Sequence, residues 1–344
     1  MLVILYMVNF REKKMKKEIL KTIIFIIIFI LILLALTKIF VPASKHSTII
    51  SEFYDEPKNT LDVIFVGESS IYKGVSPMKI WEKYKITSYD YAASGAKLYN
   101  NYYSIKEAIK YQKPKVIVLN TDQLFHGEPF KEGYKRLLYD ATRLNMNKLE
   151  AISDPVQNNT KGEQVSFVFP ILRYHSRWSE LKEEDFIKEK GKYEYIFKGQ
   201  WVVKGIEVYD GKKIDKFQNL NEDEVKYFEK IVDLCKENNI ELIAVEFPSI
   251  QTWNDNKKEK VEQIAKDNNV KFIDLHDVLG EIGLDWTRDT EDGGNHLNYR
   301  GAEKISDYLG KFLSENYKFE NYKKEEVYKS WEEELAKYNE YKNK

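Results

Sequence analysis

The sequence has very little of several features that would point directly to a class of function. It contains one cysteine, Cys235, so an intrachain disulfide is impossible. Cys235 continues an apolar helical stripe, and we interpret it as a small core residue. The formal net charge of −1 gives no argument for nucleic acid or another polyanion as a partner. We also find no internal repeat and no long low-complexity segment.

The composition is that of a globular protein with an attached hydrophobic segment. Hydrophobic residues make up 43% of the 344 positions and charged residues 32%. This length allows one large domain or two smaller ones, with room for an anchor.

A long apolar run near the N-terminus predicts a membrane anchor. Residues 1–21 are basic from Arg11 onward, and residues 22–41 contain a single charge, Lys38. About twenty apolar residues cross a bilayer core of ~30 Å, and Lys38 lies close enough to the end to snorkel. The basic flank keeps the N-terminus in the cytoplasm and places the rest of the chain outside the cell membrane. A cleaved signal peptide is the alternative, but its apolar region is only ~7–15 residues long.

Strands and helices then alternate along the chain. Apolar β-rich runs predict strands at 61–66, 88–92, 115–120, 240–246 and 270–274, and helical patterns fall at 77–84, 98–111, 222–238, 255–267 and 302–313. This order predicts right-handed crossovers and a central parallel sheet of about five strands. We expect a linker at 42–60, an α/β domain at 61–316 and, because the rhythm is lost at 125–218, an insertion that builds a cap or groove.

The C-terminal residues 317–344 are highly charged and carry an aromatic stripe at helical spacing. They predict an amphipathic helix that packs on its own domain, with partner binding or membrane contact as alternatives.

A serine near the start of the domain and a histidine near its end are the candidate catalytic pair. Ser69 and Ser70 follow the first buried strand, and we expect them in the turn just past its carboxyl end. In open α/β sheets, ligands bind at that edge. A serine hydroxyl needs a neighbouring base. His296 suits that role, and a carboxylate must hold its ring. Asp292 is the nearest candidate and Asp289 the reserve.

The insertion supplies two further candidates. His175 and Trp178 are predicted either to contact a polar or glycan substrate or to pack between insertion and core. No convincing set of metal ligands is found, and the expected chemistry needs neither metal nor other cofactor.

Four short blocks together resemble the SGNH/GDSL hydrolase superfamily, in its membrane-anchored branch of cell-surface acyl esterases and acyltransferases. The run Gly67-Glu68-Ser69-Ser70 stands at the first block, Ala93-Ser94-Gly95 at the second, Asn120-Thr121-Asp122 at the third and His296-Leu297-Asn298 at the last. By register, Ser69 and not Ser70 matches the nucleophile. The likeness covers about residues 60–125 and 220–315.

The resemblance implies a flavodoxin-like three-layer α/β/α fold and an oxyanion hole. That hole would use the Gly95 N–H and, at the third block, Asn120. Two positions depart from the family pattern. The acid usually stands three residues before the histidine, where this chain has Gly293, and the third block lacks the usual Gly-x-Asn-Asp.

Three functions follow as hypotheses. The first is an extracytoplasmic serine hydrolase of the cell envelope that removes O-acyl groups from a surface glycan or polymer. The second is an O-acyltransferase that works with a membrane acyl donor protein. The third is a non-catalytic scaffold that keeps the fold and binds a glycan.

Overall fold

The computed structural model describes residues 2–186, 193, 195–209, 219–319 and 325–344. These residues form two compact units. One contains residues 44–159 and 190–344, and the other contains residues 1–43 and 160–189. Parts of the predicted insertion (187–192, 194 and 210–218) and residues 320–324 of the predicted C-terminal helix lie outside the described residues.

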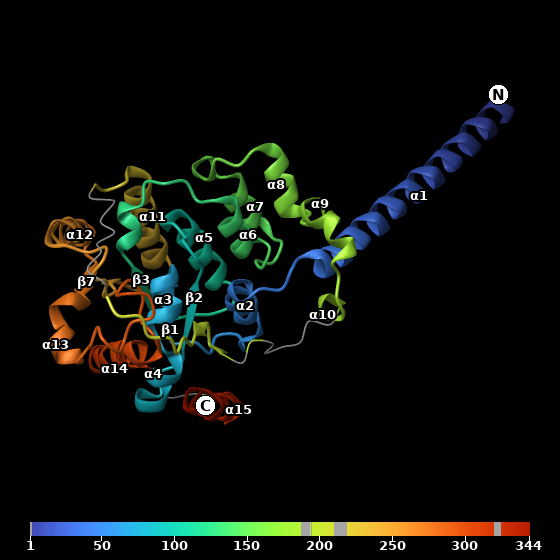
Figure 1. Cartoon of the computed structure of the whole chain (residues 1–344). Coiled ribbons are helices and arrows are strands. Elements are labelled where there is room, and N and C mark those ends of the chain that lie inside the picture. The colour runs from blue at the N-terminus through green and yellow to red at the C-terminus, as the bar shows by residue number, and fades with distance from the viewer. Residues whose placement is uncertain (1, 187–192, 194, 210–218, 320–324) are drawn as a thin grey trace. The chain divides into compact units, whose positions relative to one another are not determined.

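The larger unit is built on a five-stranded sheet in the order β2-β1-β3-β6-β7 (Figure 1), and every neighbouring pair is parallel. All residues of the first three strands are buried, because helices cover both faces of a parallel sheet. The predicted flavodoxin-like parallel sheet is thereby confirmed. The strands are β1 (Val63–Gly67), β2 (Ser88–Ala92), β3 (Val116–Asn120), β6 (Glu241–Glu246) and β7 (Lys271–Asp274).

Two helical layers enclose this sheet. Helices α5 (Leu98–Ala108), α11 (Glu222–Glu237) and α12 (Asp255–Asp267) lie on one side, and α4 (Pro77–Tyr84) and α14 (Tyr299–Asn316) lie on the other (Figure 1). Each is an amphipathic segment that turns its apolar stripe to the sheet. Cys235 is buried on α11, as its stripe predicts.

The region after β1 differs from the prediction in one respect. Ser69 and Ser70 do not lie in a turn but begin a short helix, α3 (Ser69–Gly74). Glu68 is its N-cap, and the Glu68 side chain accepts a hydrogen bond from the Ser70 N–H. The sequence did not predict this helix, because a segment of six residues is too short to show the apolar periodicity that would support the Glu68 cap.

The predicted linker at 42–60 contains a short helix and a helical turn. Helix α2 (Lys45–Glu52) and η1 (Phe53–Asp55) bury Ile49, Ile50 and Phe53 in the larger unit. The segment packs on the larger unit because its apolar side chains recur at helical spacing and share one face.

The C-terminal helix α15 (Glu325–Asn343) packs on its own unit, against α4. Trp331 and Tyr338 of the predicted stripe are almost fully buried, while Tyr328 stays half exposed. The remaining elements of this unit are η2 (Asp122–Phe125), α6 (Glu132–Tyr139), α7 (Met146–Ser153), η3 (Pro155–Gln157), β4 (Ile196–Phe197), β5 (Gln200–Trp201), η5 (Leu275–Val278) and α13 (Leu279–Ile282).

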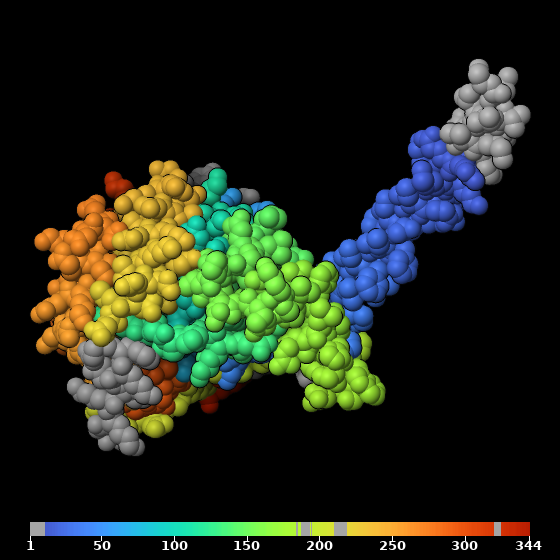
Figure 2. Space-filling model, turned by 90° about the horizontal axis from the view of Figure 1, so that it is seen from above, coloured from blue at the N-terminus to red at the C-terminus, as the bar shows by residue number. Residues whose placement is uncertain are grey.

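The smaller unit contains the long N-terminal helix α1 (Leu2–Phe40) and part of the predicted insertion. Residues 11–40 of α1 are long and apolar enough to cross a membrane, and the large apolar side chains from Met15 to Ile32 are exposed along the helix (Figure 2). Arg177 donates a hydrogen bond to the Phe40 carbonyl (2.5 Å) and pairs with Asp185 (3.0 Å). The insertion part comprises α8 (Lys161–Val168), α9 (Ile171–Tyr174), η4 (His175–Ser179) and α10 (Glu183–Phe186).

Candidate active site

The structure brings Ser69 and His296 together although 227 positions separate them in the sequence. The Ser69 Oγ lies 2.8 Å from the His296 Nε2, and the His296 Nδ1 lies 2.5 Å from the Asp292 Oδ2. These two contacts form a continuous hydrogen-bonded chain from hydroxyl to carboxylate. An imidazole that donates from Nδ1 to a carboxylate keeps Nε2 as an acceptor for the serine proton.

The electrostatic surroundings of Asp292 favour its ionised form in this series of hydrogen bonds. Burial alone would raise the pKa of Asp292, but the hydrogen bonds and charge of His296 outweigh it and hold the pKa below its usual value. Asp292 Oδ1 also accepts the His296 backbone N–H at 2.6 Å. The Asp292 carboxylate therefore contacts both the backbone N–H and the ring of His296, which limits rotation of the ring.

Two glycines allow an acid four residues before the histidine to reach it. Gly293 and Gly294 both have positive φ (72° and 92°), so the loop doubles back between acid and base. The space is tight as well, because a Cβ at Gly294 would lie 2.5 Å from the Ile250 side chain. The Gln251 side chain donates to the Gly293 carbonyl at 2.7 Å and secures the turn.

The reserve acid is engaged elsewhere. Asp289 is 1% exposed, and its Oδ2 accepts hydrogen bonds from the Asp285 N–H (2.7 Å) and the Lys304 Nζ (2.6 Å). Asp289 therefore braces the start of α14, while Asp292 contacts the imidazole.

Glu68 is a residue of this site that the sequence reasoning did not single out. Its Oε2 lies 3.1 Å from the Ser69 Oγ, and its Oε1 accepts the Ser70 hydroxyl at 2.8 Å. The Ser69 hydroxyl thus has two acceptors within reach, the Glu68 carboxylate and the His296 ring. The available signal was an acidic residue directly before the serine, a position where a carboxylate caps a helix and faces its first side chains.

The two predicted oxyanion-hole residues lie at the carboxyl ends of the strands on either side of β1. Asn120 ends β3, and a side chain at Gly67 would collide with the Asn120 Cβ, so β3 and the Ser69 segment are in close contact. The Asn120 Nδ2 is buried and has no hydrogen-bond partner among the described residues. A buried amide without a partner calls for a ligand or water.

Gly95 lies in the turn after β2. It has a positive φ of 61°, and the Ala96 N–H bonds to the Ala93 carbonyl at 3.0 Å. The neighbouring Ser94 Oγ contacts the hydroxyl of Tyr72 on α3 at 2.8 Å. The predicted second block is therefore tied to the helix that begins with Ser69.

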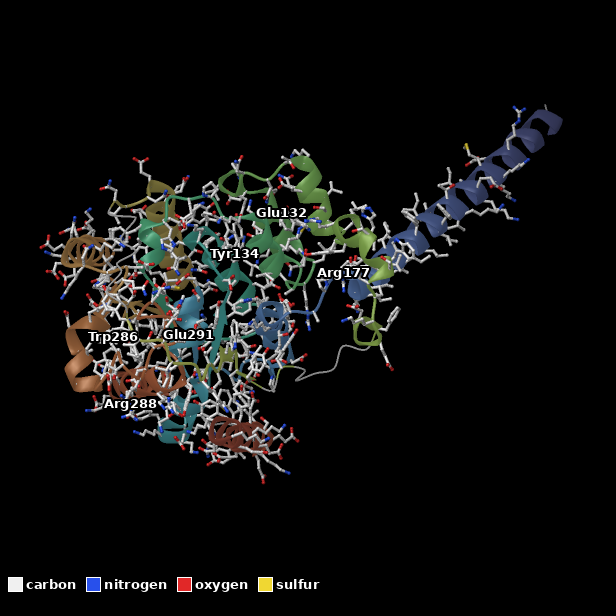
Figure 3. All side chains as sticks on the ribbon, in the orientation of Figure 1. Glu132, Tyr134, Arg177, Trp286, Arg288 and Glu291 are labelled. Atoms are coloured by element: carbon white, nitrogen blue, oxygen red, sulfur yellow. The ribbon has the colours of Figure 1, made fainter. Side chains whose placement is uncertain are left out.

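Further charged residues lie next to the loop that carries Asp292. Lys73 on α3 forms an ion pair with Glu291, which lies beside that helix (Figure 3). Glu291, Asp292 and His296 offer ligand atoms within 4.8 Å of one another, the spacing of a possible metal site. Since Lys73 neutralises Glu291 and both ring nitrogens of His296 have partners, the donor set fits a hydrogen-bonded chain better than a metal centre.

A pocket of about 290 Å³ opens beside Ser69 and His296. Asp122, His126 and Glu246 lie on its wall together with Ser69 and His296. Burial raises the pKa of Glu246 well above its usual value. Polar side chains make up most of the pocket lining.

His175 and Trp178 do not line this pocket. Both lie on η4 of the smaller unit, where the His175 Nδ1 contacts the Leu172 carbonyl at 3.0 Å and Trp178 is 73% exposed. Their predicted role in substrate binding stays a prediction.

Three solved structures are similar to parts of this chain. A G-D-S-L family protein from Desulfitobacterium hafniense, proposed to be lipolytic, matches at 12% identity over 73% of this chain and 98% of that chain, with a TM-score of 0.36. A proposed acylhydrolase from Bacteroides fragilis matches at 13% identity, 77% and 94% coverage and a TM-score of 0.38. A GDSL-like lipase from Bacteroides thetaiotaomicron matches at 11% identity, 74% and 88% coverage and a TM-score of 0.34. No family model matches the sequence, and no curated protein matches it.

Proposed function

We propose that the protein is a membrane-anchored serine ester hydrolase of the SGNH/GDSL type that removes O-acyl groups from a glycan or polymer outside the cell. The observation that carries this proposal is the chain of hydrogen bonds from Ser69 through His296 to Asp292. The apolar stretch of α1 supports the anchor, and the basic residues before it support an extracytoplasmic catalytic unit.

The chemistry proceeds through an acyl-enzyme. His296 Nε2 takes the proton of Ser69, and the Ser69 Oγ attacks the ester carbonyl. The N–H groups of Ser69 and Gly95 and the side chain of Asn120 stabilise the oxyanion. The imidazolium, held by Asp292, then protonates the leaving alcohol. A water molecule activated by His296 releases the acid and restores Ser69.

The test uses the full-length protein in detergent with an aryl acetate ester. Wild type should release acetate, and Ser69→Ala should lose at least about 10³-fold of the rate. A Ser69→Ala variant as active as wild type would exclude the proposal and leave a binding scaffold.

The same intermediate would make the protein an acyltransferase if a sugar hydroxyl replaced water. Adding a surface polymer as acceptor separates these outcomes, because a transferase would move the acetyl group to the polymer instead of releasing acetate.

A further inference from the structure

The pocket beside Ser69 is unusually polar for a ligand site. Eleven of its twelve lining residues carry polar or charged side chains, and Phe247 is the single apolar residue among those described. Ligand pockets are usually lined mainly by apolar side chains and span roughly 300–1,000 Å³. At about 290 Å³ this one is small as well. A long acyl chain would strip water from these walls without replacing its hydrogen bonds.

Asp122 belongs to the same pocket lining as Ser69 and His296. Its Oδ2 lies 2.9 Å from the His126 Nε2, while its Oδ1 is buried and has no hydrogen-bond partner among the described residues. The Lys257 Nζ lies 4.0 Å from this Oδ1. A buried carboxylate oxygen without a donor requires an explanation, and a ligand hydroxyl would supply one.

Asp122 is surrounded by polar groups that form hydrogen bonds. Burial alone would lower the pKa of His126, but Asp122 outweighs this and raises the pKa. The Lys257 Nζ donates to the Thr252 carbonyl at 2.5 Å, and the Thr121 hydroxyl donates to the Glu246 Oε2 at 2.6 Å. The wall therefore offers both hydrogen-bond donors and acceptors.

We propose that Asp122 and His126 form a subsite for the alcohol part of the ester and that it selects a neutral, hydroxyl-rich ring, in chemical class a sugar. This inference rests on the proposed ester chemistry at Ser69. Ring hydroxyls donate to the Asp122 carboxylate and accept from His126, which matches the wall. An anionic sugar would place its carboxylate near Asp122 and be rejected.

The experiment compares two acetate esters on the full-length protein in detergent. One is 4-nitrophenyl acetate, which has no hydroxyl groups, and the other is a mono-O-acetylated methyl hexoside. Asp122→Asn and His126→Gln should lower kcat/KM on the sugar ester about tenfold more than on the aryl ester, mainly through KM, because a hydrogen bond to a charged group is lost.

Asp277→Asn is the matched control. Asp277 is 56% exposed and pairs with Lys258 at the surface, so this variant should leave both rates as in wild type. Equal losses on both esters in the Asp122 and His126 variants, or no loss on either, would overturn the subsite.

A binding measurement separates this inference from the proposed function. Methyl hexoside should bind to the Ser69→Ala protein and lose affinity about tenfold when Asp122→Asn is added, and a methyl uronoside should bind more weakly than the hexoside. These results stand even if no ester is hydrolysed. Stronger binding of the uronoside than of the hexoside would refute the subsite, and so would hexoside binding that Asp122→Asn does not weaken. Neither result would decide the chemistry at Ser69, which has its own test.

Discussion

Two of the aspartate–histidine pairs at the carboxyl end of the sheet, Asp292–His296 and Asp274–His276, differ in the group that meets the far ring nitrogen. His296 contacts Asp292 through Nδ1 at 2.5 Å and reaches the Ser69 hydroxyl with Nε2. His276 contacts Asp274 through Nδ1 at 2.7 Å, but its Nε2 accepts the Ser249 backbone N–H at 2.9 Å.

The surroundings of the second pair are those of a structural element. The ring of Trp253 stacks on His276 at 5.8 Å, and its Nε1 donates to Asp274 at 2.9 Å. Both ring nitrogens of His276 are thereby engaged in holding two loops together. An aspartate–histidine pair is consequently not a catalytic signature by itself, because the group at the second ring nitrogen determines what the pair can do.

The largest expected difference between the pairs is in ester hydrolysis. His296→Gln should lower kcat/KM on an aryl acetate by about 10⁴-fold or more, because no base then accepts the serine proton. His276→Gln should keep the rate within about threefold, since that ring touches no reacting atom. Steady-state kinetics on both purified variants provide the measurement.

Circular dichroism must show that both histidine variants are folded. A folded His276→Gln protein without activity would remove the distinction between the two pairs.

The two candidate acids, Asp292 and Asp289, sharpen the comparison. Asp292→Asn should lower kcat by about 10²–10⁴-fold, because the imidazole loses the partner that sets its tautomer. Asp289→Asn should cost about 1–3 kcal/mol of stability through the Lys304 contact and have little effect on kcat. Kinetics and urea unfolding on both variants separate these effects, and Asp289 would be the acid if the kcat losses were reversed.

Substitution of Asn120 tests whether its side chain stabilises the oxyanion that forms beside Ser69 and His296. Asn120→Ala should lower kcat by about 10²–10³-fold and change KM little, as loss of one oxyanion donor does. Asn101→Ala is a suitable control, because Asn101 is also a buried asparagine whose Nδ2 has no partner among the described residues, but it lies on α5. Similar kcat losses in both variants would argue for a packing effect.

The smallest expected difference concerns acid stability, where the two pairs should act alike. Burial alone would raise the pKa of Asp274, but hydrogen bonds and charge from His276 outweigh it, and the pKa is lowered, as at Asp292. A depressed pKa stabilises the fold above the unfolded-state value of ~3.9, and that stabilisation is lost as the pH falls through the lower folded-state value.

Asp274→Asn and Asp292→Asn should therefore both flatten the decline of stability below about pH 4. The effect should be larger at Asp274, whose side chain is 2% exposed, than at Asp292, which is 36% exposed. Urea midpoints between about pH 2 and 6 measure it. A steeper decline in either variant would contradict the sign of these shifts.

Much of the fold could be predicted because it is encoded locally. The strand at Ser88–Ala92 and the helices at Pro77–Tyr84 and Asp255–Asp267 have the predicted bounds, since apolar periodicity, Ser-Pro capping and strand composition are read within a few residues. The helices α3 and α2 were missed, because six and eight residues are too few to give a clear helical pattern in the sequence.

The sequence by itself determined which residue types were available, a serine after a buried strand and a histidine in a glycine-rich loop. Only the tertiary structure decided that Asp292 and not Asp289 contacts the His296 ring, that Glu68 shares the Ser69 hydroxyl, and that His276 is occupied by a backbone N–H. The physical reason is that hydrogen bonds depend on distance and direction. Those quantities arise only when strand order brings distant loops to the same edge of the sheet.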